Sequence, residues 1–190
     1  MVSATDRQAI LHILQHSFAE NKAVNFAVRG GKKNEKGRQI LMAYALWYAE
    51  SFGEVIINET RDAAALLVEP QRKRTSRKSV LWDLRLAFRS IGILRTAKIM
   101  KREAQVKKYF PRTPYLYLWF IGVDVQTQGQ GRGGQLLSSI KELAVARQLP
   151  IYLATSTERN FAFYETHGLT CTGIFSDQYY TTHIYCYSPA

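Results

Sequence analysis

Residues 126–137 read QTQGQGRGGQLL, and four glycines fall between positions 129 and 134. Glycines clustered in this way let a backbone approach a ligand closely, because they carry no side chain. The run YLYLWFIGVDV (115–125), which has the strongest strand pattern in the chain, lies immediately before them. Apolar residues at helical spacing follow over about 133–147. The stretch is therefore predicted to be a glycine loop between a strand and a helix.

Two common phosphate-binding motifs fit this loop poorly. A P-loop requires Lys and then Ser or Thr after its last glycine, but Gln135 and Leu136 follow Gly134. A Rossmann site, read as Gly129-x-Gly131-x-x-Gly134, starts at the end of a strand and has an acid about 20 residues later. Here polar residues separate the strand from Gly129, and the next strand ends in ATST without an acid. We exclude a nucleoside triphosphatase and disfavour a dinucleotide site.

A different spacing, Gln128-x-x-Gly131-x-Gly133, resembles the pyrophosphate-binding motif of the GCN5-related N-acetyltransferase (GNAT) family. A second block, ERNFAFYETHGL (158–169), resembles a later segment of that family, and its matching residues are Asn160, Phe163, Tyr164, Glu165 and Gly168. The resemblance is specific over residues 115–175. Element order alone makes residues 38–70 and 176–188 compatible with it. The first 37 residues and the segment 71–112 carry no family signature.

The resemblance implies an α/β fold, with a single GNAT-type domain over residues 1–190 that carries a basic helical insertion at about 71–112. Its central sheet would be mixed, mostly antiparallel and flanked by helices. Hydrophobic periodicity predicts helices over 5–20, 38–52, 79–95, 96–109, 133–147 and 157–168, and strands over 53–59, 63–69, 115–125, 150–156 and in a hairpin formed by LTCTGIFS and TTHIYCYS. Strands 115–125 and 150–156 are joined through a helix, so they should be parallel.

The resemblance also implies acetyl-CoA binding where strands 115–125 and 150–156 splay apart. Backbone groups of Ile121, Gly122 and Val123 would pair with the pantetheine arm, and a glycine inside a strand predicts a bulge or a close approach. Asn160 would hydrogen-bond the same arm. The loop amides would hold the pyrophosphate at the positive end of a helix. The loop residues assigned to the cofactor are Gln128, Gly129, Gln130, Gly131, Arg132 (an added cation), Gly133 and Gly134, the last of which we also expect to serve in helix packing.

Acetyl transfer to an amine needs a deprotonated amine, a stabilised oxyanion and a protonated leaving thiolate. Tyr164 matches the family position that often protonates the sulfur of coenzyme A, and a phenol with a reference pKa of about 10 can donate at neutral pH. A packed helix tyrosine is the alternative. The general base stays open between Glu59, Glu69 and a water chain. Glu69 is the preferred carboxylate, although a structural role is the commoner one for either residue.

The net charge of +11 is concentrated in one segment, because residues 71–112 contain fourteen Lys or Arg and only two acids. The segment carries +12 and the remainder of the chain −1. Val80, Leu84, Phe88, Ile91 and Leu94 recur in it at helical spacing, which predicts an amphipathic helix. Three interpretations compete: a structural lid with a solvated basic face, an electrostatic guide for coenzyme A or an acidic substrate, and a nucleic-acid or anionic-membrane surface.

Apolar residues make up 46% of the chain, enough for a core, yet no apolar run approaches the roughly 18 residues of a transmembrane helix. The N-terminus lacks a basic region and predicts a first helix capped by Ser3 or Thr5, so we expect a cytoplasmic protein. Cys171 and Cys186 form neither a disulfide framework nor a metal set. They would face each other if the last hairpin is centred between residues 178 and 179.

These patterns predict an acetyl-CoA-dependent N-acetyltransferase that acts on a small-molecule amine by direct attack in a ternary complex. An acyl-CoA-binding regulatory module without turnover is the alternative from another class. Contact of the basic segment with nucleic acid or a membrane is a further possibility. The acceptor and the oligomeric state, monomer or homodimer, stay open.

Overall fold

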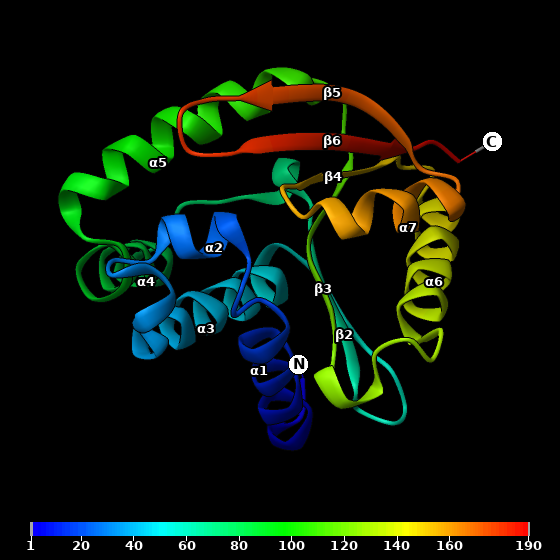
Figure 1. Cartoon of the computed structure of the whole chain (residues 1–190), viewed down its shortest axis with the longest axis horizontal. Helices are drawn as coiled ribbons and strands as arrows, with labels where there is room; N and C mark the ends of the chain where they lie inside the picture. Colours follow the sequence, from blue (N-terminus) through cyan, green and yellow to red (C-terminus); the bar gives the residue numbers. More distant parts are fainter. Residues whose placement is uncertain (1, 190) are drawn as a thin grey trace.

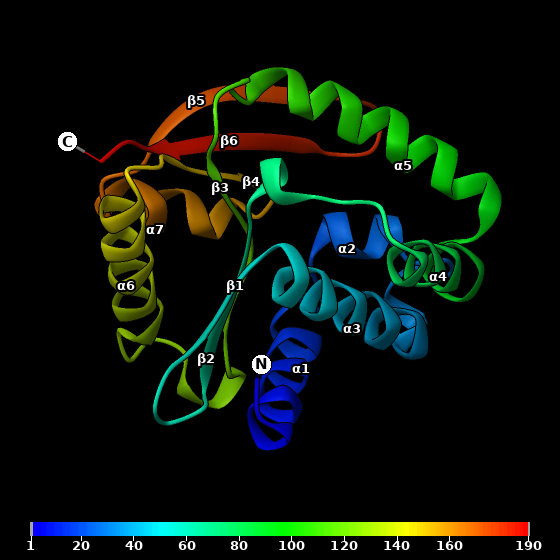
Figure 2. The same cartoon turned by 180° about the vertical axis from the view of Figure 1, so that it is seen from behind.

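A six-stranded sheet with the order β1-β2-β3-β4-β6-β5 runs through the protein, and helices cover both of its faces (Figures 1 and 2). The computed structural model describes residues 2–189, apart from the side chains of 93 and 94. The strands are β1 (Gly53–Ile57), β2 (Ala63–Val68), β3 (Leu116–Val123), β4 (Ile151–Thr155), β5 (Thr170–Ser176) and β6 (Thr181–Tyr187). The α-helices are α1 (Ala4–Ser17), α2 (Lys22–Ala27), α3 (Glu35–Phe52), α4 (Arg77–Leu86), α5 (Ile93–Val106), α6 (Arg132–Arg147) and α7 (Phe161–Thr166).

The predicted α/β class with a mixed, mostly antiparallel sheet is confirmed. Only β3 and β4 pair in parallel, and the other four strand pairs are antiparallel. Helices α1 and α3 cover one face of the sheet, where Leu66 and Phe120 join their apolar side chains. Helices α6 and α7 cover the other face, where Leu67 and Leu116 are buried. Strand β2 is buried along its whole length because both of its faces are covered.

The sheet opens between β3 and β4, as the sequence predicted. These strands pair only at Leu116 with Ile151 and at Tyr117 with Tyr152. Beyond that point β3 stays paired with β2 as far as Val123, while β4 stays paired with β6 as far as Thr155. A register shift between β2 and β3 leaves Trp119 as an extra residue just past the last parallel pair. Such a bulge bends its strand and increases its twist, which helps to separate the two strands.

The basic segment differs from its prediction. A single helix over 79–95 was expected, but α4 ends at Leu86 and a π-helical turn follows over Ala87–Ile91. Gly92 then has φ 88°, a left-handed value that ends the helical path, and α5 starts directly after it. The helix expected over 96–109 therefore begins earlier than predicted. Leu94, one of the predicted apolar positions, has a side chain outside the described part of the structure.

The C-terminal hairpin has the predicted centre, since Ser176 pairs with Thr181. A register shift between Cys171 and Gly173 then places Cys171 opposite Tyr185 instead of Cys186. The expected face-to-face arrangement of the two thiols is therefore wrong, because the bulge moves them out of register. Both cysteines are free. Among residues 2–189, no helix is both long and apolar enough to span a bilayer.

Candidate active site

A cavity of about 680 Å³ lies at the opening between β3 and β4. Four parts of the chain line it: the end of β3, the glycine loop with the start of α6, the turn from β4 into α7, and the connection from α1 to α2. It brings together all the predicted site residues except Gln130, namely Ile121, Gly122, Val123, Gln128, Gly129, Gly131, Arg132, Gly133, Gly134, Asn160 and Tyr164. Residues separated by more than 40 positions in the sequence therefore share one cavity.

The edge of β3 that faces this cavity has backbone groups that β2 does not use. The amide of Asp124 donates to the carbonyl of Asp62, the residue before β2, at 2.7 Å, so the backbone of Asp124 faces the β2 side. Backbone groups alternate in direction along an antiparallel strand, so those of Val123 and Ile121 point away from β2. The side chain of Gln128 donates to the Val123 carbonyl at 3.2 Å, which agrees with this direction. Ile121 and Val123 thus present polar backbone groups to the opening.

The glycine loop ends in an uncapped helix start. Gly129 and Gly131 have φ values of +81° and +78°, and an added Cβ would meet nothing within 4 Å at either. Gly131 is the N-cap of α6 and has no side-chain capping bond, and the first helical hydrogen bond runs from Gln135 N to Gly131 O. The amides of residues 132–134 precede this first bonded amide, so they have no acceptor within the helix. Together with the helix dipole, these amides favour an anion.

The other glycines of the site have packing roles. A Cβ at Gly134 would lie 2.6 Å from His167 Nε2, so α7 packs against α6 there, as expected. A Cβ at Gly122 would lie 2.6 Å from Ser17 Oγ, so α1 approaches β3 closely at this glycine. Of the two predictions for Gly122, close approach is correct, because the bulge lies at Trp119 instead.

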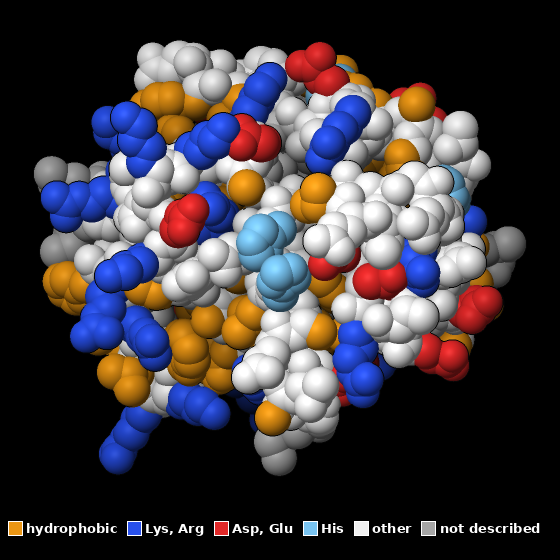
Figure 3. Space-filling view, turned by 60° about the horizontal axis from the view of Figure 1, so that its bottom comes forward, with side chains coloured by type: hydrophobic (Ala, Val, Ile, Leu, Met, Phe, Trp, Pro, Cys, Tyr) orange, Lys and Arg blue, Asp and Glu red, His pale blue; other side chains and the backbone are white. Residues whose placement is uncertain are grey.

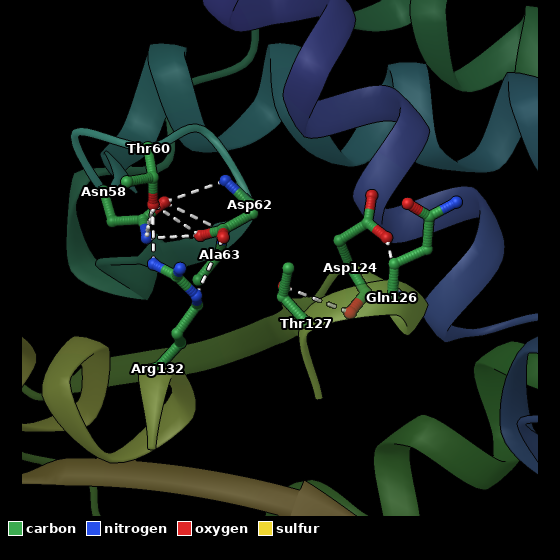
Figure 4. A network of polar contacts seen from close by, with 8 residues as sticks. All are labelled: Asn58, Thr60, Asp62, Ala63, Asp124, Gln126, Thr127 and Arg132. Atoms are coloured by element: carbon green, nitrogen blue, oxygen red, sulfur yellow. Dashed lines mark hydrogen bonds and ion pairs between the residues drawn. The ribbon is translucent and has the colours of Figure 1, made fainter. Parts of the chain in front are cut away.

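Arg132 lines the cavity, but its charge is paired. Figure 4 shows its guanidinium turned toward the turn between β1 and β2, where Nε lies 2.8 Å from Asp62 Oδ2 and Nη1 donates to Thr60 Oγ1 at 2.8 Å. Burial alone would raise the pKa of Asp62, but hydrogen bonds from Asn58 and Thr60 and the charge of Arg132 outweigh it and lower that pKa. Arg132 therefore ties the start of α6 to the β1–β2 turn. Arg159 also lines the cavity, and no acidic partner contacts it among residues 2–189.

Tyr164 reaches the cavity from α7 and is only 4% exposed. Burial, with a smaller effect from the neighbouring Tyr185, raises the pKa of its phenol above the ordinary value. The hydroxyl therefore stays protonated at neutral pH and can act as a donor. Within the described residues it makes no hydrogen bond to another group, whereas the Tyr185 hydroxyl donates to Glu165 at 2.9 Å.

The connection from α1 to α2 contributes residues that the sequence did not predict. Ser17, Phe18, Glu20 and Asn21 line the cavity. Asn21 Nδ2 donates to Thr157 Oγ1 at 3.2 Å, which links this connection to the turn after β4. No motif marks these residues, because their position depends on how α1 packs against β3.

Neither carboxylate considered as a general base lines the cavity. Glu69 follows β2 at the end where Val68 pairs with Tyr117, far along the sheet from the glycine loop. It is 7% exposed and forms ion pairs with Arg147 at 2.6 Å and Arg72 at 3.0 Å. Glu59 lies exposed in the β1–β2 turn. Glu69 thus has a structural role, which was expected from the sequence as the commoner role for these carboxylates.

The basic segment presents an apolar and basic surface to solvent. Leu81 is 67% and Phe88 61% exposed, and Val80 and Leu84 are also exposed. Lys and Arg side chains gather among apolar ones on the left of Figure 3, the side on which α4 lies in Figure 1. Val80, Leu84 and Phe88 of the predicted stripe are therefore not packed on the sheet, whereas Ile91 is buried.

No family model matches the chain. Solved structures of acetyltransferases are similar to it over almost their whole length. A Corynebacterium glutamicum protein described as histone acetyltransferase HPA2 and related acetyltransferase has 16% identity and a TM-score of 0.69, with 100% of this chain and 94% of that chain covered. An arylalkylamine N-acetyltransferase from Aedes aegypti has 15% identity and a TM-score of 0.65, with 98% and 96% covered. The polyamine N-acetyltransferase of Drosophila melanogaster has 12% identity and a TM-score of 0.61, with 99% and 97% covered. At these identities the likeness establishes architecture, and the chain has the fold of the GCN5-related N-acetyltransferases.

Proposed function

We propose that this protein is an acetyl-CoA-dependent N-acetyltransferase that acetylates a small-molecule amine by direct attack in a ternary complex. One observation carries the proposal. The residues that resemble two separate GNAT motifs line a single cavity at the opening of the sheet, and the amides at the start of α6 lie there without helical partners.

The lining residues fit coenzyme A in the order of its parts. The amides of residues 132–134 would hold the pyrophosphate, and Gly129 and Gly131 leave space for it because they carry no side chain. The charge of Arg132 is paired with Asp62, so Arg159 would supply the positive charge beside the pyrophosphate. Ile121 and Val123 would pair with the amides of the pantetheine arm, and Asn160 would add a side-chain hydrogen bond. The bound cofactor supplies an acetyl thioester.

Tyr164 is the residue we assign to protonation of the leaving sulfur. Its raised pKa keeps the hydroxyl protonated, and Tyr164 lines the same cavity, where it would face the thioester end of a bound pantetheine arm. The neighbours from Aedes aegypti and Drosophila melanogaster are named for arylalkylamine and polyamine acetylation. These names support a small amine as the acceptor class.

Two measurements test the proposal. Isothermal titration calorimetry should detect acetyl-CoA binding, and a thiol-release assay should detect coenzyme A formation with a panel of aryl- and alkylamines. Binding with thiol release establishes the enzyme. Tight binding with no release on any amine supports a regulatory module instead. Absence of binding rejects both.

A membrane contact of the basic segment is favoured over a nucleic-acid contact by the exposed apolar side chains of α4. Such side chains gain little beside a phosphate backbone but are buried when a basic amphipathic helix lies on an anionic bilayer. Sedimentation with phosphatidylserine vesicles, but not with phosphatidylcholine vesicles, would support this role. Nucleic-acid binding that survives about 200 mM salt would support the other.

A further inference from the structure

A second cavity, of about 380 Å³, lies beside the cofactor cavity and has no part in the proposed function. The start of α2, the turn from β4 into α7, and β6 line it through Lys22, Ser156, Glu158, Phe161, Thr181 and His183. His183 and Tyr185 alternate along β6 and point to one face, on which Tyr185 packs in the core with α6 and α7. The cavity therefore lies on the α7 side of the sheet.

A wall formed by two segments of the chain separates the two cavities. Asn21 and Thr157 line the cofactor cavity, whereas their sequence neighbours Lys22, Ser156 and Glu158 line the second one. Asn21 Nδ2 donates to Thr157 Oγ1 at 3.2 Å and joins the two segments. No residue lines both cavities, so the second cavity is a site of its own.

Two opposite charges stand at this cavity and are weakly paired. Lys22 Nζ lies 3.6 Å from Glu158 Oε1, and the two side chains are 64% and 80% exposed. An ion pair exposed to this degree contributes little to stability, because water screens it and two long side chains must be ordered. A ligand with one positive and one negative group would open the pair at little cost. A ligand with a single charge would leave either Lys22 or Glu158 without a counter-charge.

Ser156 offers a hydrogen-bonding group that the protein does not use. The residue is only 6% exposed, and its hydroxyl has no hydrogen-bond partner among residues 2–189. Buried hydroxyls usually have a partner, because a buried polar group without one destabilises the fold. An oxygen of a ligand in this cavity would satisfy the Ser156 hydroxyl.

An aromatic wall completes the cavity. The ring centroids of Phe161 and His183 lie 4.1 Å apart, with 33° between the ring planes. His183 Nδ1 lies 3.9 Å from Cys171 Sγ, so Nε2 is the ring nitrogen left for a ligand. Thr181 adds an exposed hydroxyl. Because aromatic rings pack well against apolar groups and other rings, this wall suits an apolar or aromatic ligand body.

We propose that the second cavity binds a small zwitterion of the α-amino acid class with an apolar or aromatic side chain. The ligand carboxylate would lie between Lys22 and the Ser156 hydroxyl. Its ammonium group would face Glu158, and its side chain would pack on Phe161. Each part of the ligand then meets a group of complementary chemistry, and none of these contacts requires the cofactor cavity.

Isothermal titration calorimetry of the whole chain without acetyl-CoA tests the ligand class. L-phenylalanine and L-leucine carry both charges, L-phenylalaninamide lacks the carboxylate, and N-acetyl-L-phenylalanine lacks the ammonium group. L-phenylalanine should bind at least about tenfold more tightly than either analogue, because each analogue loses a charged hydrogen bond. The measurement does not depend on acetyl transfer, so failure of the proposed function would leave its outcome unchanged.

Two variants locate the ligand. Ser156→Ala should weaken L-phenylalanine binding about 10- to 150-fold, because it removes a hydrogen bond to a carboxylate. It should not lower the Tm, since the hydroxyl has no partner within the described part of the protein. Lys22→Met should weaken binding at least about tenfold for the same reason. Lys36→Met, which changes an exposed lysine that lines neither cavity, should match wild type.

Three results would overturn the proposal. Wild type that binds neither L-phenylalanine nor L-leucine has no such site. Equal Kd values for L-phenylalanine and its two analogues would mean that the charges of Lys22 and Glu158 do not select the ligand. If Ser156→Ala and Lys22→Met bind L-phenylalanine as tightly as Lys36→Met does, the ligand lies outside this cavity.

Discussion

Replacing Gly131 with valine tests the cofactor loop most directly. Gly131 has φ +78°, and an added Cβ would meet no protein atom within 4 Å. The substitution therefore causes backbone strain without a clash inside the protein. The new side chain would stand at the N-cap of α6, beside the amides of residues 132–134 that we assign to the pyrophosphate.

Gly131→Val should have two separable effects, a loss of stability and a loss of acetyl-CoA affinity. A side chain in the left-handed region costs about 1–2 kcal/mol, which lowers the Tm of a chain of this size by about 2–8 °C. Loss of one hydrogen bond to a charged phosphate costs about 1.5–3 kcal/mol, and about 1.4 kcal/mol corresponds to tenfold in affinity. The Kd of acetyl-CoA should therefore rise about 10- to 150-fold for each bond lost.

A matched control separates the effect of backbone strain on stability from the loss of acetyl-CoA binding. Gly30 also has a left-handed φ, +82°, and its added Cβ would make only an ordinary contact with Asn34 at 3.5 Å. Gly30 does not line the cavity, so Gly30→Val should lower the Tm by a similar amount and leave the affinity unchanged. Calorimetry and thermal unfolding measure both quantities. A folded Gly131→Val protein that binds acetyl-CoA as tightly as wild type would refute the assignment of the loop.

Four other substitutions probe the site. Tyr164→Phe should lower kcat while the Kd of acetyl-CoA changes little, and an unaltered rate in the thiol-release assay would mean that another group protonates the sulfur. Gly122→Ala places a Cβ 2.6 Å from Ser17 Oγ and should cost about 1–3 kcal/mol in urea unfolding, whereas Gly133→Ala meets its nearest atom at 3.5 Å and should be close to neutral. Asp62→Asn should be less stable than wild type at pH 7. Because the pKa of Asp62 is lowered on folding, this gap should narrow as pH falls below about 4, and a gap independent of pH would exclude the ion pair as its cause.

The glycine loop and the parallel strand pair were predictable because both are encoded locally. Gln128, Gly131 and Gly133 lie within six residues of one another between a clear strand and a clear helix, and glycine is the residue that tolerates a left-handed φ. The parallel strands followed from the helix that joins them. Both inferences use neighbours in the sequence, and the structure agrees with both.

The charges could not be assigned in the same way, because their partners are far apart in the chain. Arg132 was expected to add a cation near the loop, but its charge is paired with Asp62, 70 positions earlier. Glu69 was the preferred base, but it pairs with Arg147, 78 positions later. Only the register of β2 against β3 and the packing of α6 bring these groups together. The bulge that separates Cys171 from Cys186 is also a tertiary effect without a sequence signal.

Of the two segments without a family signature, only the first reaches the cavity, because no residue of 71–112 lines it. Helix α1 reaches the cavity because Gly122 lets it approach β3, which places Ser17 and Asn21 on the cofactor side. The chain after α5 instead packs on the last paired residues of β3 and β4, where the Phe110 ring lies 5.4 Å from that of Tyr117 and 5.8 Å from that of Tyr152. The cavity is thus lined both by residues of the two motifs and by residues of the α1–α2 connection that carry no motif, and only the former could be found from the sequence.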